Sequence, residues 1–139
     1  MRSRKLLVFL SAGLMIGTFV TLVPAKKPRS IASGQWGGPH IQMQVANGSA
    51  TIEYDCANGS IDGPLKLDSR GRFSLSGKHF REHGGPIRMG EEKKGVTARY
   101  TGRIDGERMT LTVTLVNSKG PMGTYQLTRG SEGRVFKCR

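Results

Sequence analysis

From residue 34 onward, apolar and polar residues alternate in short runs that are separated by glycine-containing turns. A period of two is typical of β-strands with one buried face. We expect strands over residues 40–45, 49–56, 64–68, 72–78, 96–104, 107–116, 122–129 and 134–138. The clearest is 107–116, where Met109, Leu111, Val113 and Leu115 alternate with polar residues. This pattern predicts an all-β protein without a convincing helix.

The turns between these runs indicate how the strands pair. Asn47-Gly48 and Asp105-Gly106 are two-residue hairpin signals, because both positions tolerate a positive φ. Consecutive strands joined in this way are antiparallel neighbours. A meander with one apolar face hides its edges best by closing on itself. We therefore expect an antiparallel up-and-down barrel of about eight strands, with a two-sheet β-sandwich as the alternative.

The N-terminal segment has a different pattern. Arg2, Arg4 and Lys5 precede a mostly apolar stretch over 6–23, which ends in Val23-Pro24-Ala25. This order of charge, apolar run and small-residue exit is typical of a secretory signal peptide. We expect a signal peptide over 1–25, a flexible basic arm over 26–33 and a single β-barrel domain over 34–139. An uncleaved membrane anchor is the alternative, because the apolar run approaches the length that spans a bilayer. The predicted location is periplasmic or extracellular.

Charge and cysteine content narrow the function further. The chain has a net charge of +12, and the leader holds three of the 22 basic residues and no acidic residue, so cleavage leaves +9. A basic surface attracts polyanions, but these charges are scattered, which favours a soluble, self-repelling surface. Nucleic acid is not expected as a partner, because no basic run alternates with aromatic residues. Two cysteines in an exported chain indicate a disulfide between Cys56 and Cys138.

One short motif adds a resemblance. Gly34-Gln35-Trp36 stands just before the first expected strand. An eight-stranded antiparallel meander opened by Gly-x-Trp resembles the calycin superfamily, the lipocalin and avidin group. The resemblance implies that Trp36 plugs one end of the barrel and that a basic residue near the C-terminus lies over its ring. Arg134 is the first choice for that residue, because it begins the last expected strand.

Chemistry on the inward face is sparse. The expected strands show no pair of inward carboxylates and no nucleophile beside a base, so we expect no enzyme, and a hydrolase is the least favoured function. His79 and His83 are four residues apart, but Gly84, Gly85 and Pro86 oppose the helix that would bring them together on a metal. No metal or cofactor is predicted.

Two kinds of non-enzymatic function remain. An apolar interior built from aromatic and aliphatic residues can hold a small apolar ligand, as the calycin resemblance implies, although small barrels are also filled by their own side chains. The candidate ligand residues are Tyr54, Phe73, Tyr100, Leu111 and Tyr125. The alternative is an interaction module, such as a protease inhibitor or an envelope-associated structural protein. It would use the long glycine-rich loop 79–95 through His79, Arg81, His83 and Arg88.

Overall fold

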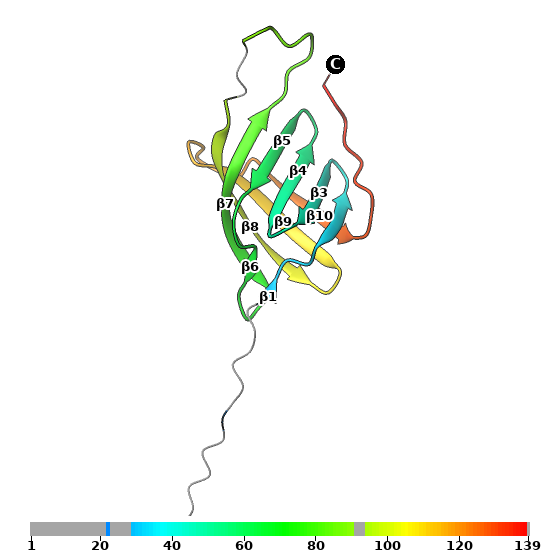
Figure 1. The fold of residues 1–139 in the computed structure, drawn as a ribbon, viewed down its shortest axis with the longest axis vertical. Helices are drawn as coiled ribbons and strands as arrows, with labels where there is room; N and C mark the ends of the chain where they lie inside the picture. Colours follow the sequence, from blue (N-terminus) through cyan, green and yellow to red (C-terminus); the bar gives the residue numbers. More distant parts are fainter. Residues whose placement is uncertain (1–21, 23–28, 91–93, 139) are drawn as a thin grey trace, which may run out of the picture.

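The computed structural model describes residues 22, 29–90 and 94–138. The predicted signal peptide therefore lies outside the described residues, apart from Leu22. All the described elements are β-strands, and eight of them form a closed antiparallel barrel (Figure 1). The all-β barrel predicted from the alternation is thus confirmed, and the sandwich alternative is not observed.

The barrel strands follow one another around the ring in chain order. They are β2 (Gly34–Gly38), β3 (Ile41–Ala46), β4 (Ser49–Tyr54), β5 (Ala57–Ile61), β7 (Arg72–Arg81), β8 (Val96–Asp105), β9 (Arg108–Leu115) and β10 (Gly123–Arg129). Every pair of neighbours is antiparallel, as the hairpin turns predicted. The ring closes where β10 pairs with β2 through Thr128 opposite Gly37 and Arg129 opposite Trp36.

Two of the eight predicted strands do not become barrel strands, and two barrel strands were missed. The predicted strand 64–68 is reduced to β6 (Lys66–Leu67), which lies outside the barrel and pairs with β1 (Arg29–Ser30). The predicted strand 134–138 contributes a single bridge, between Pro39 and Arg134. The missed strands are β2 and β5, whose glycines resembled turns in the sequence. Part of the predicted basic arm is also ordered, since 29–30 form β1 and Ile31 is buried.

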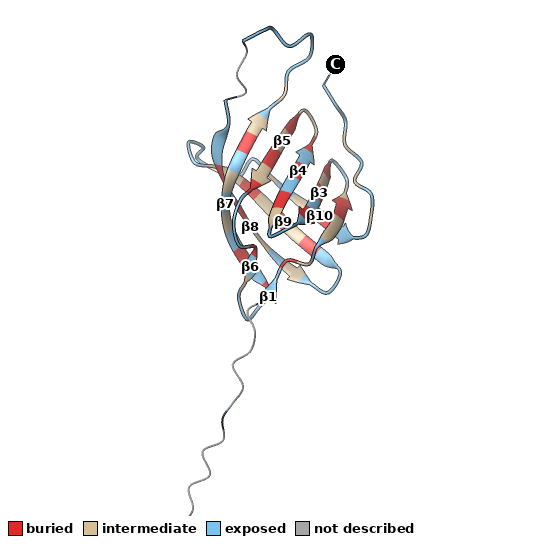
Figure 2. Ribbon diagram, viewed as in Figure 1, coloured by how far each residue is buried: buried red, intermediate tan, exposed pale blue. Residues whose placement is uncertain are grey.

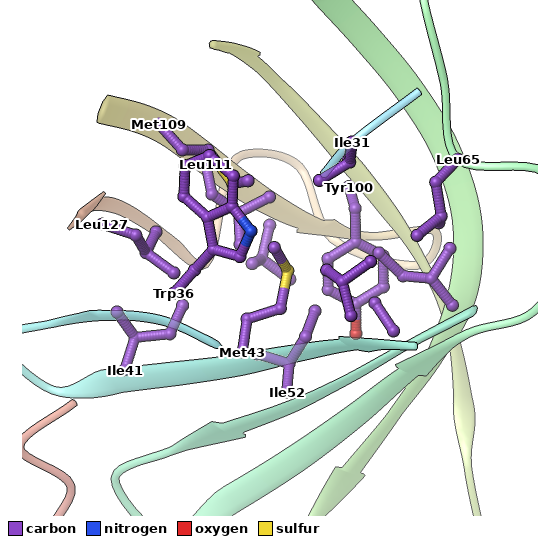
Figure 3. Packing of buried hydrophobic residues seen from close by; sticks show 14 of the residues in the cluster. Ile31, Trp36, Ile41, Met43, Ile52, Leu65, Tyr100, Met109, Leu111 and Leu127 are labelled. Atoms are coloured by element: carbon purple, nitrogen blue, oxygen red, sulfur yellow. The ribbon is translucent and has the colours of Figure 1, made fainter. Parts of the chain in front are cut away.

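One end of the barrel is covered by the chain itself. Ile31 and Leu65, which come from segments outside the barrel strands, are both buried, and the Ile31 backbone N–H donates to the Leu65 carbonyl oxygen at 2.9 Å. Both side chains pack beside Tyr100 in the interior (Figure 3). We call this the closed end. The turns after β4, β7 and β9 lie at the other end, which we call the mouth.

Apolar side chains fill the barrel between the closed end and its middle. The inward face of nearly every strand is buried and the outward face is exposed (Figure 2). Trp36 is only 1% exposed, and its indole N–H donates to the Ala32 carbonyl oxygen at 3.1 Å. The Tyr100 ring, from β8, lies over Gly77 of the neighbouring strand β7, and its hydroxyl donates to the Lys78 carbonyl oxygen at 2.9 Å. A Cβ at Gly59 would overlap the Tyr100 hydroxyl, which explains glycine in the middle of β5.

Candidate functional site at the barrel mouth

The mouth contains a pocket of about 510 Å³. This volume falls within the range of known small-molecule sites, about 300–1,000 Å³. The pocket is lined by residues from the mouth ends of six elements, namely Tyr54, Asp55, Cys56, Ala57, His79, Arg81, Lys94, Val96, Leu115, Met122 and Tyr125. We call it the mouth pocket. The pocket lies at the mouth end of the barrel, beyond the part of the interior that buried side chains fill.

Three rings form the inner part of this pocket. Tyr54 ends β4 on its inward face, His79 lies on the inward face of β7, and Tyr125 lies on β10. The Tyr54 ring centroid is 5.7 Å from that of His79 and 5.5 Å from that of Tyr125, in tilted geometries that aromatic pairs favour. Tyr54 and His79 are 2% and 6% exposed, and Tyr125 is half-buried.

Two of these rings carry a buried polar atom that is not satisfied. Tyr54 Oη and His79 Nδ1 have no hydrogen-bond partner of acceptable geometry among the described residues. The Tyr100 hydroxyl donates to Lys78, and its oxygen is close enough to Tyr54 Oη to affect the Tyr54 pKa, but the two hydroxyls do not meet hydrogen-bond geometry. A buried polar group without a partner typically costs about 1–3 kcal/mol of stability. Buried, unsatisfied polar atoms in a pocket are what a ligand with a hydrogen-bonding group can satisfy.

Both groups are held in their neutral forms. Burial raises the pKa of Tyr54 far above its ordinary value, and the nearby Tyr100 hydroxyl adds to this effect, so the phenol stays protonated. Burial lowers the pKa of His79 below its usual range, and the neighbouring Arg81 guanidinium lowers it further. At neutral pH the pocket therefore offers a phenol O–H and a neutral imidazole.

The rim of the pocket is basic. Arg81 and Lys94 are both exposed, and neither forms an ion pair within the described part of the chain. Asp55, the only carboxylate among the lining residues, already accepts hydrogen bonds from the Phe136 backbone N–H and from His40. The Phe136 N–H, followed by His40, holds the pKa of Asp55 below its usual range. Asp55 therefore stays ionised, and its charge adds to burial in raising the pKa of Tyr125, so the lining carries two cations against one carboxylate.

The C-terminal segment 131–138, which we call the strap, is fastened beside the mouth. The predicted disulfide between Cys56 and Cys138 is present, and the Cys56 N–H donates to the Phe136 carbonyl oxygen at 3.2 Å. Lys137 pairs with Glu53 and Glu82, with nitrogen–oxygen distances of 3.4 and 3.7 Å. The C-terminal end of the strap and the β7–β8 loop lie at the same end of the barrel (Figure 1). The disulfide therefore ties the chain terminus to a residue of the mouth pocket.

The strap and β10 together explain two of the glycines of β2, Gly37 and Gly38. A Cβ at Gly37 would overlap the backbone at Ser131 and Gly133, and a Cβ at Gly38 would overlap the Gln126 carbonyl oxygen. The Arg134 N–H donates to the Gly38 carbonyl oxygen at 3.1 Å. These glycines permit close backbone approach at the closure of the barrel.

The five predicted ligand residues separate into two groups. Phe73, Tyr100 and Leu111 are buried in the filled interior, whereas Tyr54 and Tyr125 line the mouth pocket. The space for a ligand therefore lies at one end of the barrel and not along its axis.

The predicted interaction loop begins later than its sequence indicated. Residues 79–81 belong to β7, so His79 is a buried pocket residue and Arg81 is part of the pocket rim. His83 and Arg88 do lie in the exposed β7–β8 loop. The described residues contain no group of three or more His, Cys, Asp or Glu side chains that could hold a metal ion.

The basic partner expected for Trp36 is also placed differently. Arg134 contacts β2 through its backbone, at Gly38 and His40, and its side chain is exposed. Arg129 is the residue directly opposite Trp36 in the β2–β10 register, and one of its guanidinium nitrogens lies 3.5 Å from the Ser33 carbonyl oxygen. Residues directly opposite on antiparallel strands project to the same face. The register therefore places Arg129, and not Arg134, opposite Trp36.

Sequence reasoning missed His79, Ala57, Val96, Leu115 and Met122 as pocket residues. A signal for His79 was present, because Phe73, Leu75, Gly77 and His79 continue the alternation of β7 on one face. Because Gly84-Gly85-Pro86 follow shortly after it, His79 was assigned to the loop and not to the strand.

Comparison of the chain with known protein families, curated proteins and solved structures finds no match. Within the described residues, no helix is long and apolar enough to cross a membrane. The function therefore has to be inferred from the mouth pocket.

Proposed function

We propose that this protein is an exported, non-enzymatic binding protein that holds a small molecule in the mouth pocket. The observation that carries the proposal is the pair of buried polar atoms without partners, Tyr54 Oη and His79 Nδ1, both on residues that line a pocket of about 510 Å³. A ligand with an apolar body and at least one hydrogen-bonding group complements this arrangement.

Export is supported by the N-terminal pattern of 1–25 and by the disulfide, since disulfides persist in oxidising compartments. A calycin-like relationship is supported by the closed eight-stranded barrel together with the buried Trp36 of Gly34-Gln35-Trp36. Catalysis is disfavoured because the pocket places no nucleophile beside a base. Its imidazole, His79, lies beside the neutral phenol ring of Tyr54 and near the Arg81 guanidinium.

The test is extraction of small molecules from the purified protein, followed by mass spectrometry. Leu115→Trp fills the pocket, and Val116→Trp is the matched control, because Val116 is 63% exposed and does not line the pocket. We expect a compound that co-purifies with the wild type and the control but not with Leu115→Trp. Equal recovery from all three proteins, or from none, would contradict ligand storage in this pocket.

The second candidate is an interaction module that acts through the β7–β8 loop. It is favoured by Ile87 and Met89, which are 69% and 104% exposed on that loop. Exposed apolar side chains of this size often mark a contact surface. A partner that binds the wild type and Leu115→Trp, but not a double Ile87→Ser, Met89→Ser variant, would favour this function over ligand binding.

A further inference from the structure

The mouth pocket has two chemically different walls. Strands β4 and β7, which lie on either side of β5, supply its polar wall, defined by Tyr54, His79 and Arg81. Strands β8, β9 and β10, with the turn before β10, supply its apolar wall, defined by Val96, Leu115, Met122 and Tyr125. A molecule that fills the pocket must face both walls at once.

The apolar wall continues to the rim. Val96 and Met122 are 37% and 40% exposed, so they present hydrocarbon both to the pocket and to solvent. Burying this surface against a ligand is favourable by the ordinary hydrophobic effect. The ligand therefore needs an alkyl or aryl portion.

The polar wall indicates which charge the remaining portion of the ligand should carry. Tyr54 offers a hydroxyl proton, and His79 offers an unsatisfied Nδ1, either as donor or as acceptor depending on its tautomer. Arg81 is two residues from His79 on the same face of β7 and close enough to influence its pKa. Hydrogen bonds from such donors are strongest when the acceptor is an anion.

The sum of the surrounding charges also favours an anion, because two cations and one carboxylate line the pocket. Lys94 adds a second cation to the rim, and the Asp55 carboxylate is already bonded by Phe136 and His40. Glu82, which follows Arg81, is bonded by Asn58 and Lys137 instead. The net charge of the pocket lining is therefore positive, with Arg81 and Lys94 against the ionised Asp55.

From these walls we propose that the ligand is an anionic amphiphile, with its anionic group against the polar wall and its hydrocarbon against the apolar wall. This inference rests on the proposed function and adds the chemical class of its ligand. A carboxylate is the simplest group that fits a phenol donor, an imidazole and a guanidinium together.

The test is calorimetric titration of the oxidised protein, cleared of co-purifying molecules, with three probes of equal chain length below their micelle concentrations. These are decanoate, decan-1-ol and decyltrimethylammonium. We expect decanoate to bind on the order of 10-fold or more tightly than decan-1-ol, and the cation to bind most weakly. Arg81→Gln should weaken decanoate binding on the order of 10-fold and leave decan-1-ol binding unchanged.

The matched control is Arg103→Gln, which removes one positive charge from an exposed residue of β8 far from the mouth. It should leave decanoate affinity unchanged, and thermal melting should show that both variants fold. Equal affinity for decanoate and decan-1-ol would overturn the anionic class but leave ligand binding in place. Equal weakening by both arginine variants would overturn it too, because bulk charge would then explain the preference. If none of the probes bound and extraction gave no compound, both proposals would fail.

Discussion

Replacing Tyr54 with phenylalanine should make the ligand-free protein more stable and the ligand complex weaker. The substitution removes one oxygen and keeps the ring, so the contacts with His79 and Tyr125 stay in place. In the ligand-free protein that oxygen is buried and has no hydrogen-bond partner among the described residues. Removing it relieves a cost of about 1–3 kcal/mol. For a domain of this size, the gain corresponds to a rise in Tm of at least about 4 °C.

Tyr100→Phe is the matched control for this experiment. It removes the same atom from the same barrel, but the Tyr100 hydroxyl donates to Lys78 at 2.9 Å. Its loss should therefore destabilise the protein by about 0.5–1.5 kcal/mol. The assay is urea unfolding of the wild type and both variants after removal of co-purifying molecules. If Tyr54→Phe destabilised the protein as much as Tyr100→Phe, the Tyr54 hydroxyl would have a partner in the free protein and the reasoning would fail.

Further predictions concern the strap and the closure of the barrel. Serine at both Cys56 and Cys138 should cost about 4 kcal/mol in urea unfolding, because the bond spans 82 residues of sequence; a loss under about 1 kcal/mol would show that the bond constrains little. Gly37→Ala should lower the Tm sharply because its Cβ would overlap the strap backbone, whereas Gly120→Ala, with open space around it, should not; equal melting would refute the close approach. The lowered pKa of Asp55 means that its stabilising effect is complete above a pH of about 4 and is lost as the pH falls through the folded pKa. In acid titrations of stability, the difference between wild type and Asp55→Ala should therefore shrink below that pH, and a constant difference would contradict the assignment.

Alternation predicted the strands whose inward positions carry large side chains. The segments 49–56, 72–78, 96–104 and 107–116 all overlap barrel strands, since each buries residues at a period of two. The missed strands β2 and β5 break this rule for a physical reason. Gly37 and Gly59 occupy strand positions because the strap and the Tyr100 hydroxyl leave no room for a Cβ. This requirement for glycine comes from contacts between residues that are far apart in the sequence. The local sequences of β2 and β5 therefore resembled turns.

The candidate site was predicted only in part, and for a related reason. The inward direction of Tyr54 and Tyr125 follows from strand period alone, and both line the pocket. Whether an inward residue faces space or a filled core depends on which strand ends meet at the mouth. That depends on the register, which pairs Gly59 with His79 and brings β4, β5 and β7 together. Composition and residue spacing do not indicate which strand ends lie together at the mouth.

The most direct measurement is of nuclear Overhauser contacts between bound decanoate and the side chains of the labelled, disulfide-bonded protein. We expect contacts from the decanoate chain to the Met122 methyl group and the Tyr125 ring, and none to interior side chains such as Leu111 or to Met89 on the loop. Contacts confined to Leu111 and its interior neighbours, or to Met89, would contradict the central claim that this barrel binds its ligand in the mouth pocket.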